Sequence, residues 1–188
     1  MKKVSPQRPR NRVAVFAIVA LLALLADRLT KLWAQVALAD GRTVVIIPRV
    51  LCLTLLRNPG ASLGMGSSVT WLISCLAFVA CVVLAYLSLT RTSLWWTAAL
   101  TLAFAGAFGN LIDRVVFAHG FLNGSVVDFL NYGWSVGNVA DIELAIAAVL
   151  IVLLLLANVP FGDQESDDGQ DAAKEPAGSV ESRGADSR

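Results

Sequence analysis

Charged residues, cysteine and histidine are all scarce in this sequence of 188 residues. Only 15% of the residues are charged and 56% are hydrophobic, whereas soluble domains typically carry about 25% charged residues. The cysteines (Cys52, Cys75 and Cys81) lack CxxC spacing, and together with the lone His119 they leave too few soft ligands for a zinc site. We therefore expect a membrane protein without a bound metal.

Motifs for several other kinds of chemistry are also missing. The sequence has no glycine loop of the type that cradles phosphates, and its basic residues are interleaved with proline rather than aromatic residues, which argues against nucleic acid binding. A serine or cysteine nucleophile needs an activating base. His119 stands alone, and Lys31, which could activate Ser62, lies four residues from Asp27 and is expected to pair with it. Both nucleophilic arrangements are therefore disfavoured.

Charge is strongly polarised along the chain. Residues 1–12 carry five basic side chains and no acidic one, whereas from Gly162 onward eight acidic side chains outnumber three basic ones. We expect a basic cytoplasmic N-terminus in residues 1–12, a membrane domain in residues 13–159 and a disordered acidic cytoplasmic tail in residues 160–188.

Four apolar runs are long enough to cross a membrane, at about residues 13–38, 70–89, 94–116 and 139–159. The first run, followed by "ALA" at residues 37–39, resembles a cleaved signal peptide, but Asp27, Arg28 and Lys31 interrupt the region before a cleavage site, so we expect a retained helix. Four spans place both termini on one side. The basic N-terminus assigns that side to the cytoplasm, although the first external loop also carries three arginines.

The two external loops then cover residues 39–69 and 117–138. In the first loop, "TVVIIPRVLCLTLL" predicts two short strands on the membrane surface, because Pro48 and "RNPG" interrupt any helix. The predicted fold class is an all-α membrane protein with four transmembrane helices and a small strand-rich external loop subdomain.

Polar residues of the predicted helices gather near their external ends. They are Asp27, Thr30 and Lys31 in the first helix, Gly106, Gly109, Asn110 and Asp113 in the third, and Asn138 and Asp141 at the start of the fourth. Their spacing of three or four residues places each set on one helix face, and ionisable groups at such depth usually mark function.

Each of these residues also has a structural interpretation. The glycines suit close helix packing, and Asp27 can neutralise Lys31 one turn away. Asp113 can form an interfacial pair with Arg114, and Asp141 can serve as the partner of a helix N-terminus. For Asp113 we favour a structural or substrate-holding role, and for Gly106 we consider a small pocket that accepts small residues of a peptide.

Asp128 is harder to explain structurally, because "SVVDFL" reads as an apolar loop segment without a basic neighbour. If Asp128 meets Asp141 within hydrogen-bond distance, the two carboxyl groups will share one proton near neutral pH. One carboxylate can then activate water while the other protonates a peptide carbonyl. Two alternatives remain open: an ion or proton transporter, and a membrane assembly factor in which both aspartates only make buried hydrogen bonds.

Five motifs occur in the order found in bacterial lipoprotein signal peptidases, also called signal peptidase II. They are "DRLTK" (27–31), "RNPGAS" (57–62), "GAFGNLIDR" (106–114), "VVDF" (126–129) and "GNVAD" (137–141). The sequence resembles this family over about residues 13–159. The resemblance implies a catalytic dyad of Asp128 and Asp141, in an aspartic endopeptidase of the bacterial inner membrane that cleaves prolipoproteins before their diacylglyceryl-modified cysteine.

The resemblance also implies that other residues shape the site. These are Asp27, Lys31, Asn58, Gly60, Asn110, Asp113, Arg114, Asn138 and Ala140. It further implies no metal or organic cofactor, contact with membrane lipids and sensitivity to globomycin-type cyclic peptides, and we expect a monomer. The sequence departs from the usual family pattern at Arg28, at residues 62–64 and at Gly137, which affects the expected lining of the pocket rather than the dyad.

Overall fold

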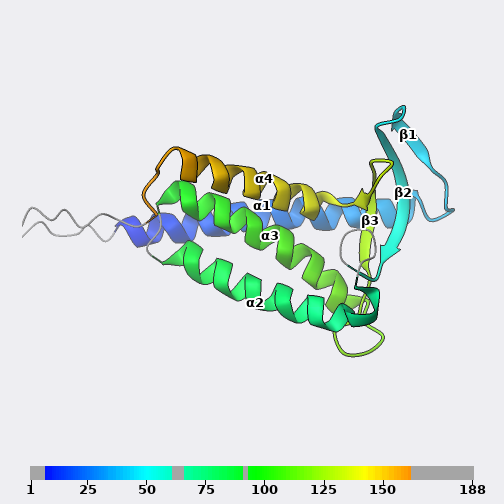
Figure 1. Cartoon of the computed structure of the whole chain (residues 1–188), viewed down its shortest axis with the longest axis horizontal. Coiled ribbons are helices and arrows are strands. Elements are labelled where there is room, and N and C mark those ends of the chain that lie inside the picture. Colours follow the sequence, from blue (N-terminus) through cyan, green and yellow to red (C-terminus); the bar gives the residue numbers. More distant parts are fainter. Residues whose placement is uncertain (1–6, 61–65, 91–92, 162–188) are drawn as a thin grey trace, which may run out of the picture.

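The described part of the chain forms four long helices with a small sheet at one end of them (Figure 1). The structure, a computed structural model, describes residues 7–60, 66–90 and 93–161. The helices are α1 (Gln7–Ala37), α2 (Thr70–Leu89), α3 (Leu94–Val116) and α4 (Val139–Leu156). All four are long and apolar enough to cross a membrane, so the predicted fold class is confirmed. Most of the predicted acidic tail and the departures at residues 62–64 lie outside the described residues.

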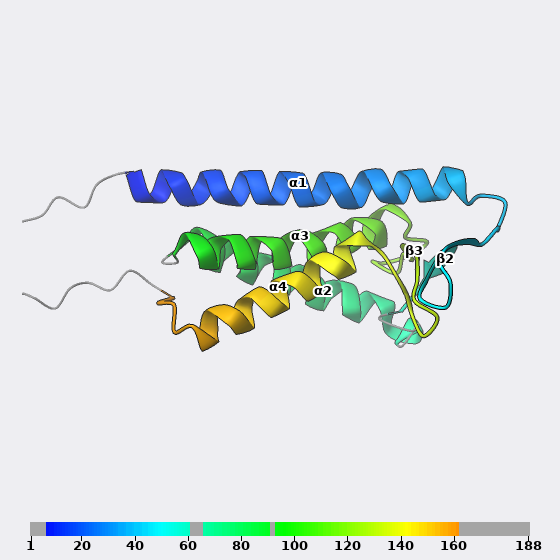
Figure 2. The same ribbon diagram turned by 90° about the horizontal axis from the view of Figure 1, so that it is seen from above.

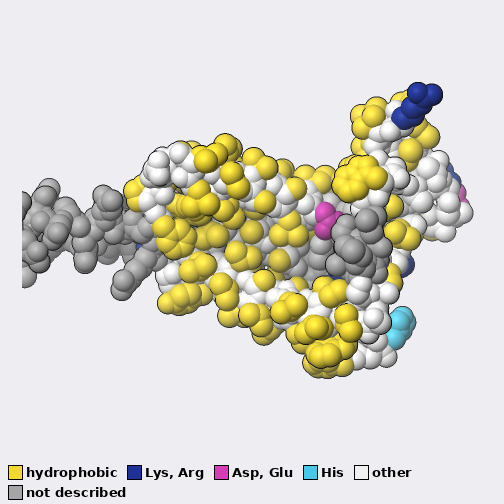
Figure 3. All heavy atoms as spheres, in the orientation of Figure 1, with side chains coloured by type: hydrophobic (Ala, Val, Ile, Leu, Met, Phe, Trp, Pro, Cys, Tyr) yellow, Lys and Arg dark blue, Asp and Glu magenta, His cyan; other side chains and the backbone are white. Residues whose placement is uncertain are grey.

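Helix α3 forms the centre of the bundle and packs against each of the other three helices. In its most apolar stretch 56% of the residues are buried, against 17% for each of the other helices. Figure 2 shows α3 between α1 and the pair α2 and α4. Small residues such as Ala99, Ala103, Ala105 and Gly106 allow this close approach. The outer helices expose their aliphatic side chains, which cover the helical part of the surface in Figure 3.

Two helix ends differ from the sequence prediction. Helix α1 begins at Gln7 rather than near Val13, because the polar and basic residues of this segment are compatible with a helix even though they are not apolar. Helix α4 ends at Leu156 rather than Val159. Asn158 adopts a positive φ of 51° just before Pro160, and both features are typical of a helix end.

The sheet contains four antiparallel strands in the order β1-β2-β3-β4. Strands β1 (Val44–Ile47) and β2 (Leu51–Asn58) are those predicted for the first connection, and a short helix, η2 (Ser67–Val69), follows them. Strands β3 (Val126–Asn131) and β4 (Val136–Gly137) were not predicted, and reading "SVVDFL" as a loop was wrong. The first four residues of β3 are all buried, so the strand lacks the apolar and polar alternation of a half-exposed strand.

A small apolar core fixes the sheet to the helices. Ala34 and Leu38 at the end of α1 pack with Phe129 of β3, and Trp33 meets Phe129 edge to face. Partly buried apolar residues from β1, β2, β3 and α4 surround them. Strand β3 is therefore held between β2 and the ends of the helices, and this placement sets the position of Asp128.

Candidate active site

Asp128 lies on β3 with only 2% of its surface exposed. Its Oδ2 accepts a hydrogen bond from Asn58 Nδ2 at 2.9 Å, and its Oδ1 accepts one from Asn138 Nδ2 at 2.6 Å. Burial raises the pKa of Asp128 from 3.8 to about 6. The hydrogen bonds from Asn58 and Asn138 lower this pKa, and the nearby Asp141 raises it by a smaller amount. A titratable acid is thus present at a fixed position in the sheet.

Asp141 lies in the first turn of α4 and is exposed. It forms a capping box with Asn138: the backbone N–H of Asp141 donates to Asn138 Oδ1 at 3.1 Å, and Asp141 Oδ2 accepts from the backbone N–H of Asn138 at 3.0 Å. Its Oδ1 accepts a third hydrogen bond from Asn110 Nδ2 at 2.9 Å. Asp141 therefore lies at a helix N-terminus, as its structural interpretation required, and still has an exposed carboxyl group.

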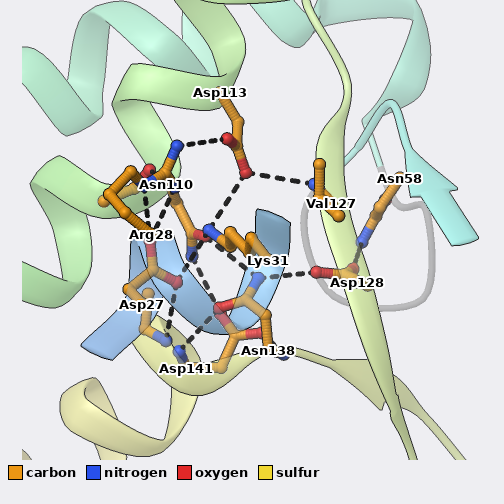
Figure 4. A network of polar contacts seen from close by, with 12 residues as sticks. Asp27, Arg28, Lys31, Asn58, Asn110, Asp113, Val127, Asp128, Asn138 and Asp141 are labelled. Atoms are coloured by element: carbon orange, nitrogen blue, oxygen red, sulfur yellow. Dashed lines mark hydrogen bonds and ion pairs between the residues drawn. The ribbon is translucent and has the colours of Figure 1, made fainter. Parts of the chain in front are cut away.

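The two aspartates are linked through amide side chains (Figure 4). Asn138 Nδ2 donates to Asp128 Oδ1 and also to Asn110 Oδ1 at 3.0 Å. Lys31 Nζ donates to the same Asn110 oxygen at 2.9 Å, so the amide nitrogen of Asn110 must point to Asp141. Instead of the direct carboxyl contact suggested by the sequence, the contacts found among the described residues join Asp128 and Asp141 through Asn138.

Beneath the aspartates lies a cluster of four charged residues, Asp27, Arg28, Lys31 and Asp113, which we call the charged cluster. Lys31 Nζ lies 2.9 Å from Asp27 Oδ1 and 3.0 Å from Asp113 Oδ2. Arg28 lies 2.6 Å from each of the same two acids. The predicted pairing of Asp27 with Lys31 is confirmed, whereas Asp113 pairs across helices rather than with its neighbour Arg114.

The charged cluster also holds the backbone beside each aspartate. Asp113 Oδ2 accepts a hydrogen bond from the backbone N–H of Val127 at 3.1 Å, and Asp27 Oδ1 accepts one from that of Ala140 at 3.3 Å. Val127 and Ala140 directly precede Asp128 and Asp141 in the sequence. The charged cluster is therefore a support for both aspartates.

Arg28, which the sequence comparison treated only as a departure, belongs to this support. Its Nη2 also donates to the carbonyl oxygen of Gly109 at 2.7 Å. Thr30 does not join the charged cluster, because its hydroxyl donates back to Ala26 O at 2.7 Å within α1. Of the three residues predicted to share a helix face, Asp27 and Lys31 belong to the charged cluster and Thr30 does not.

Gly106 and Gly109 allow the helices to approach one another. A Cβ atom on Gly106 would lie 2.6 Å from the carbonyl oxygen of Ala140, and one on Gly109 would lie 2.7 Å from Asp27 Oδ2. Neither distance is compatible with a side chain, and Ala140 is fully buried at this contact. The geometry favours the packing interpretation over the small peptide pocket considered for Gly106.

Asn58, Gly60 and Arg114 close the sheet side of the site. Asn58 Oδ1 accepts a hydrogen bond from the backbone N–H of Gly60 at 3.0 Å, and Gly60 O accepts one from Arg114 Nη2 at 2.6 Å. Arg114 is only 5% exposed, and its Nη1 has no hydrogen-bond partner within the described residues.

A cleft of about 580 Å³ brings these groups together. Its polar lining is Asn58, Asn110, Arg114, Asp128, Ser135 and Asp141, and its apolar lining includes Ile73 and Ala77 of α2, Ala107 of α3, and Ile142, Leu144 and Ala145 of α4. Acidic atoms reach the surface where the helices meet the sheet end (Figure 3). A pair of carboxyl groups beside a partly apolar cleft can perform acid–base chemistry on a peptide bond.

Three residues of this region were missed by sequence reasoning. Tyr132 and Trp134 line the cleft from the turn between β3 and β4, and the "YGWS" segment could have indicated that turn. Glu143 of α4 is 6% exposed, and its Oε2 finds no hydrogen-bond partner in the described part of the chain. Among residues 7–60, 66–90 and 93–161, no group of three or more His, Cys, Asp or Glu side chains is suited to a metal ion.

Comparison with known proteins identifies the family. The model of signal peptidase (SPase) II matches residues 19–157. The lipoprotein signal peptidase of Bifidobacterium adolescentis is 61% identical over 166 residues, which cover 88% of this chain and 89% of the relative. That of Rhodococcus jostii is 38% identical over 152 residues, covering 80% and 76%. A solved bacterial membrane enzyme, determined by the in meso method at 2.3 Å resolution, is 29% identical with a TM-score of 0.66, covering 78% of this chain and 90% of that one. This chain belongs to the signal peptidase II family.

Proposed function

We propose that Asp128 and Asp141 are the catalytic dyad of this aspartic peptidase, which removes signal peptides from prolipoproteins. The observation that carries the assignment is their common position: both line one cleft, and Asn138 contacts both. Their partners are amide groups, which position a carboxylate without neutralising it. The carboxylates of the charged cluster, by contrast, are bound to cations.

In the proposed mechanism, Asp128 and Asp141 hydrolyse the peptide bond by transferring protons. Asp128, whose pKa is raised to about 6 by burial, holds this proton and donates it to the carbonyl oxygen of the scissile peptide bond. Asp141 takes a proton from a water molecule, whose oxygen bonds to the carbonyl carbon. The C–N bond then breaks, the amine leaves with a proton from Asp141, and Asp128 recovers its own.

The lining of the cleft supports a substrate that stays in the membrane. Apolar residues of α2 and α4 form two of its walls, so we infer that a diacylglyceryl-modified prolipoprotein enters laterally and is cleaved before the lipid-bearing cysteine. Each methylene group kept out of water contributes about 0.8 kcal/mol to this preference. Membrane lipids and globomycin-type cyclic peptides are expected to bind beside the same walls.

We further propose that the sheet end faces the exterior of the bacterial cytoplasmic membrane. Both ends of the described chain lie at the opposite end of the bundle (Figures 1 and 2). The basic residues of the N-terminal segment favour the cytoplasmic side for that end. In this orientation the dyad lies where a lipid-modified precursor would present its cleavage site. A monomer provides every residue named in the cleft.

Separate Asp128→Asn and Asp141→Asn variants test the dyad. Each should lose at least about a thousandfold in cleavage of a diacylglyceryl-modified precursor peptide, because one step of proton transfer is removed. Each should still insert and unfold at a temperature close to that of the wild type. Product formation by mass spectrometry and thermal unfolding in detergent measure the two effects. Asp40→Asn, an exposed acid far along the chain from the dyad, is the control. A variant that cleaves at the wild-type rate would favour a transport or assembly role.

A further inference from the structure

A second cavity, of about 410 Å³, adjoins the cleft. Within the described residues its lining comes from β2 (Leu56, Arg57 and Asn58), from Pro59, and from the β3–β4 region including Asn131 and Trp134. No residue of α1 to α4 belongs to this described lining. We call this space the sheet cavity, to distinguish it from the cleft, which has walls from α2, α3 and α4.

The sheet cavity and the cleft share part of their walls. Asn58, Trp134, Ser135 and Val136 line both spaces. Asn58 is the same residue that donates a hydrogen bond to Asp128 at 2.9 Å. A substrate peptide that extends from the cleft into the sheet cavity therefore passes Asn58, which directly contacts the proposed proton donor Asp128.

The two spaces differ in the elements that line them: helix residues form walls of the cleft but not of the described part of the sheet cavity. A signal peptide is apolar and remains among helices in the bilayer, whereas the mature segment after the scissile bond must leave the membrane. The cleft offers apolar helix residues such as Ile73 and Ile142. The sheet cavity offers Arg57 and Asn131, which do not line the cleft. A precursor whose apolar signal peptide lies among the helix walls of the cleft would therefore extend its mature segment toward the sheet cavity.

The turn between β3 and β4 lines both spaces and is held by hydrogen bonds. The Tyr132 backbone N–H donates to Ser135 O at 2.9 Å, and the Gly133 N–H donates to Asn131 Oδ1 at 2.8 Å. Gly133 has a φ of +86°, which favours glycine at this position. Trp134 is 76% exposed, and its ring stacks on Tyr132 with centroids 6.1 Å apart. A large exposed aromatic residue on an ordered turn is a typical binding element.

We propose that the sheet cavity binds the first residues of the mature lipoprotein, those that follow the lipid-modified cysteine, with Trp134 packing against them. The proposal rests on the function proposed above and extends it to the part of the substrate after the scissile bond. Arg57 is the charged residue in the described lining of the sheet cavity, and its guanidinium lies 4.1 Å from the centroid of the Phe117 ring and donates to Gln35 at 2.7 Å. Acidic residues at these substrate positions should therefore be favoured over basic ones.

The test compares two lipopeptides with the same signal sequence and the same diacylglyceryl cysteine. The short peptide ends at the cysteine as an amide, and the long peptide continues for about four residues, enough to extend across the sheet cavity. With the full-length enzyme in detergent, we expect kcat/KM for the long peptide to be about tenfold higher. Leu56→Trp, which narrows the sheet cavity, should reduce the ratio between long and short peptides to about one.

Two controls sharpen this test. Val45→Trp adds the same ring to β1, whose residues lie outside both linings, and should leave the ratio unchanged. With Glu or Lys at the second mature position, the wild type should prefer Glu by about threefold, and Arg57→Gln should remove this preference. Equal rates for long and short peptides, or a ratio unaffected by Leu56→Trp, would overturn the proposal while leaving the dyad intact. Failure to cleave either peptide would instead contradict the proposed function.

Discussion

Two groups of acidic residues lie side by side in this protein, and they are built differently. In the charged cluster, Asp27 and Asp113 are 0% and 1% exposed and contact Arg28 and Lys31 at 2.6 to 3.0 Å. In the proposed dyad, the carboxylates accept hydrogen bonds from amides and line a cleft. Cations compensate the buried charge and fix it, whereas amides fix a carboxyl group and leave its proton available for chemistry.

The two groups nevertheless depend on one another. Each acid of the charged cluster holds the backbone N–H just before one aspartate of the dyad, at Val127 and at Ala140. Lys31 orients Asn110, which in turn donates to Asp141. We infer that the charged cluster maintains the distance between β3 and the first turn of α4, which carry the two aspartates. Substitutions in it should affect folding first and catalysis as a consequence.

The largest effect is expected for Asp113→Ala. This change leaves Arg28 and Lys31 with one acid between them and removes the acceptor for the Val127 N–H. Breaking a buried ion pair by removing one partner typically costs about 3–5 kcal/mol. We expect a loss of folded protein, measured as the free energy of unfolding in mild detergent or as the yield of protein resistant to protease.

Asp40→Ala is the matched control, because Asp40 is exposed and only 3.7 Å from the exposed Arg42. Its unfolding should remain close to that of the wild type. If Asp113→Ala were as stable as Asp40→Ala and lost only activity, Asp113 would belong with the dyad, and the distinction between the two groups would fail.

Sequence reasoning identified the residues that a helix places on one face. The spacing of Asp27 and Lys31 predicts their contact, because residues four apart on a helix are neighbours. The spacing of Asn138 and Asp141 likewise placed them together at the start of the fourth helix, where the structure shows a capping box. Such contacts depend only on local geometry, so a single sequence is sufficient to predict them.

Contacts between elements could not be predicted in the same way. The bridge from Asn138 to Asn110 joins residues 28 positions apart, and the register of β2 and β3 brings Asn58 to Asp128 across 70 positions. Arg28 also escaped prediction, because its partner Asp113 lies 85 residues away on α3. Strand β3 gave no alternating signal since four consecutive residues are buried.

A smaller effect, confined to activity, is expected for Asn138→Ser. Serine can still cap α4, but it removes the amide that donates to Asp128 and Asn110. We expect cleavage of the lipid-modified precursor to fall by about a hundredfold, as for the loss of one well-placed donor. The free energy of unfolding should change little.

Asn138→Ala separates the two roles of this residue. It removes the cap as well as the amide and should lower stability by about 1 kcal/mol more than Asn138→Ser. The two variants should have similar residual activity. A much higher rate for the more stable Asn138→Ser variant than for Asn138→Ala would assign the effect to helix capping rather than to the link between the aspartates.

The smallest effect is a shift of the pH profile. Because burial raises the pKa of Asp128 from 3.8 to about 6, kcat/KM should decline as the pH rises through about 6 and Asp128 loses the proton that it donates. The hydrogen bond from Asn138 lowers this pKa, so in Asn138→Ser the decline should move to higher pH. Initial rates of precursor cleavage between pH 4 and 9 measure both profiles.

The pH dependence of stability provides an independent check that the pKa of Asp128 is raised in the folded protein. The folded protein binds the proton of Asp128 more tightly than the unfolded chain does, so this group's contribution to stability is complete below pH 3.8 and is lost as the pH rises to about 6. Asp128→Asn has no such proton, and the difference between its unfolding temperature and that of the wild type should change over this range. If the difference were constant with pH, Asp128 would not be the group that holds the proton, and the contrast between amide-held and cation-held acids would have to be abandoned.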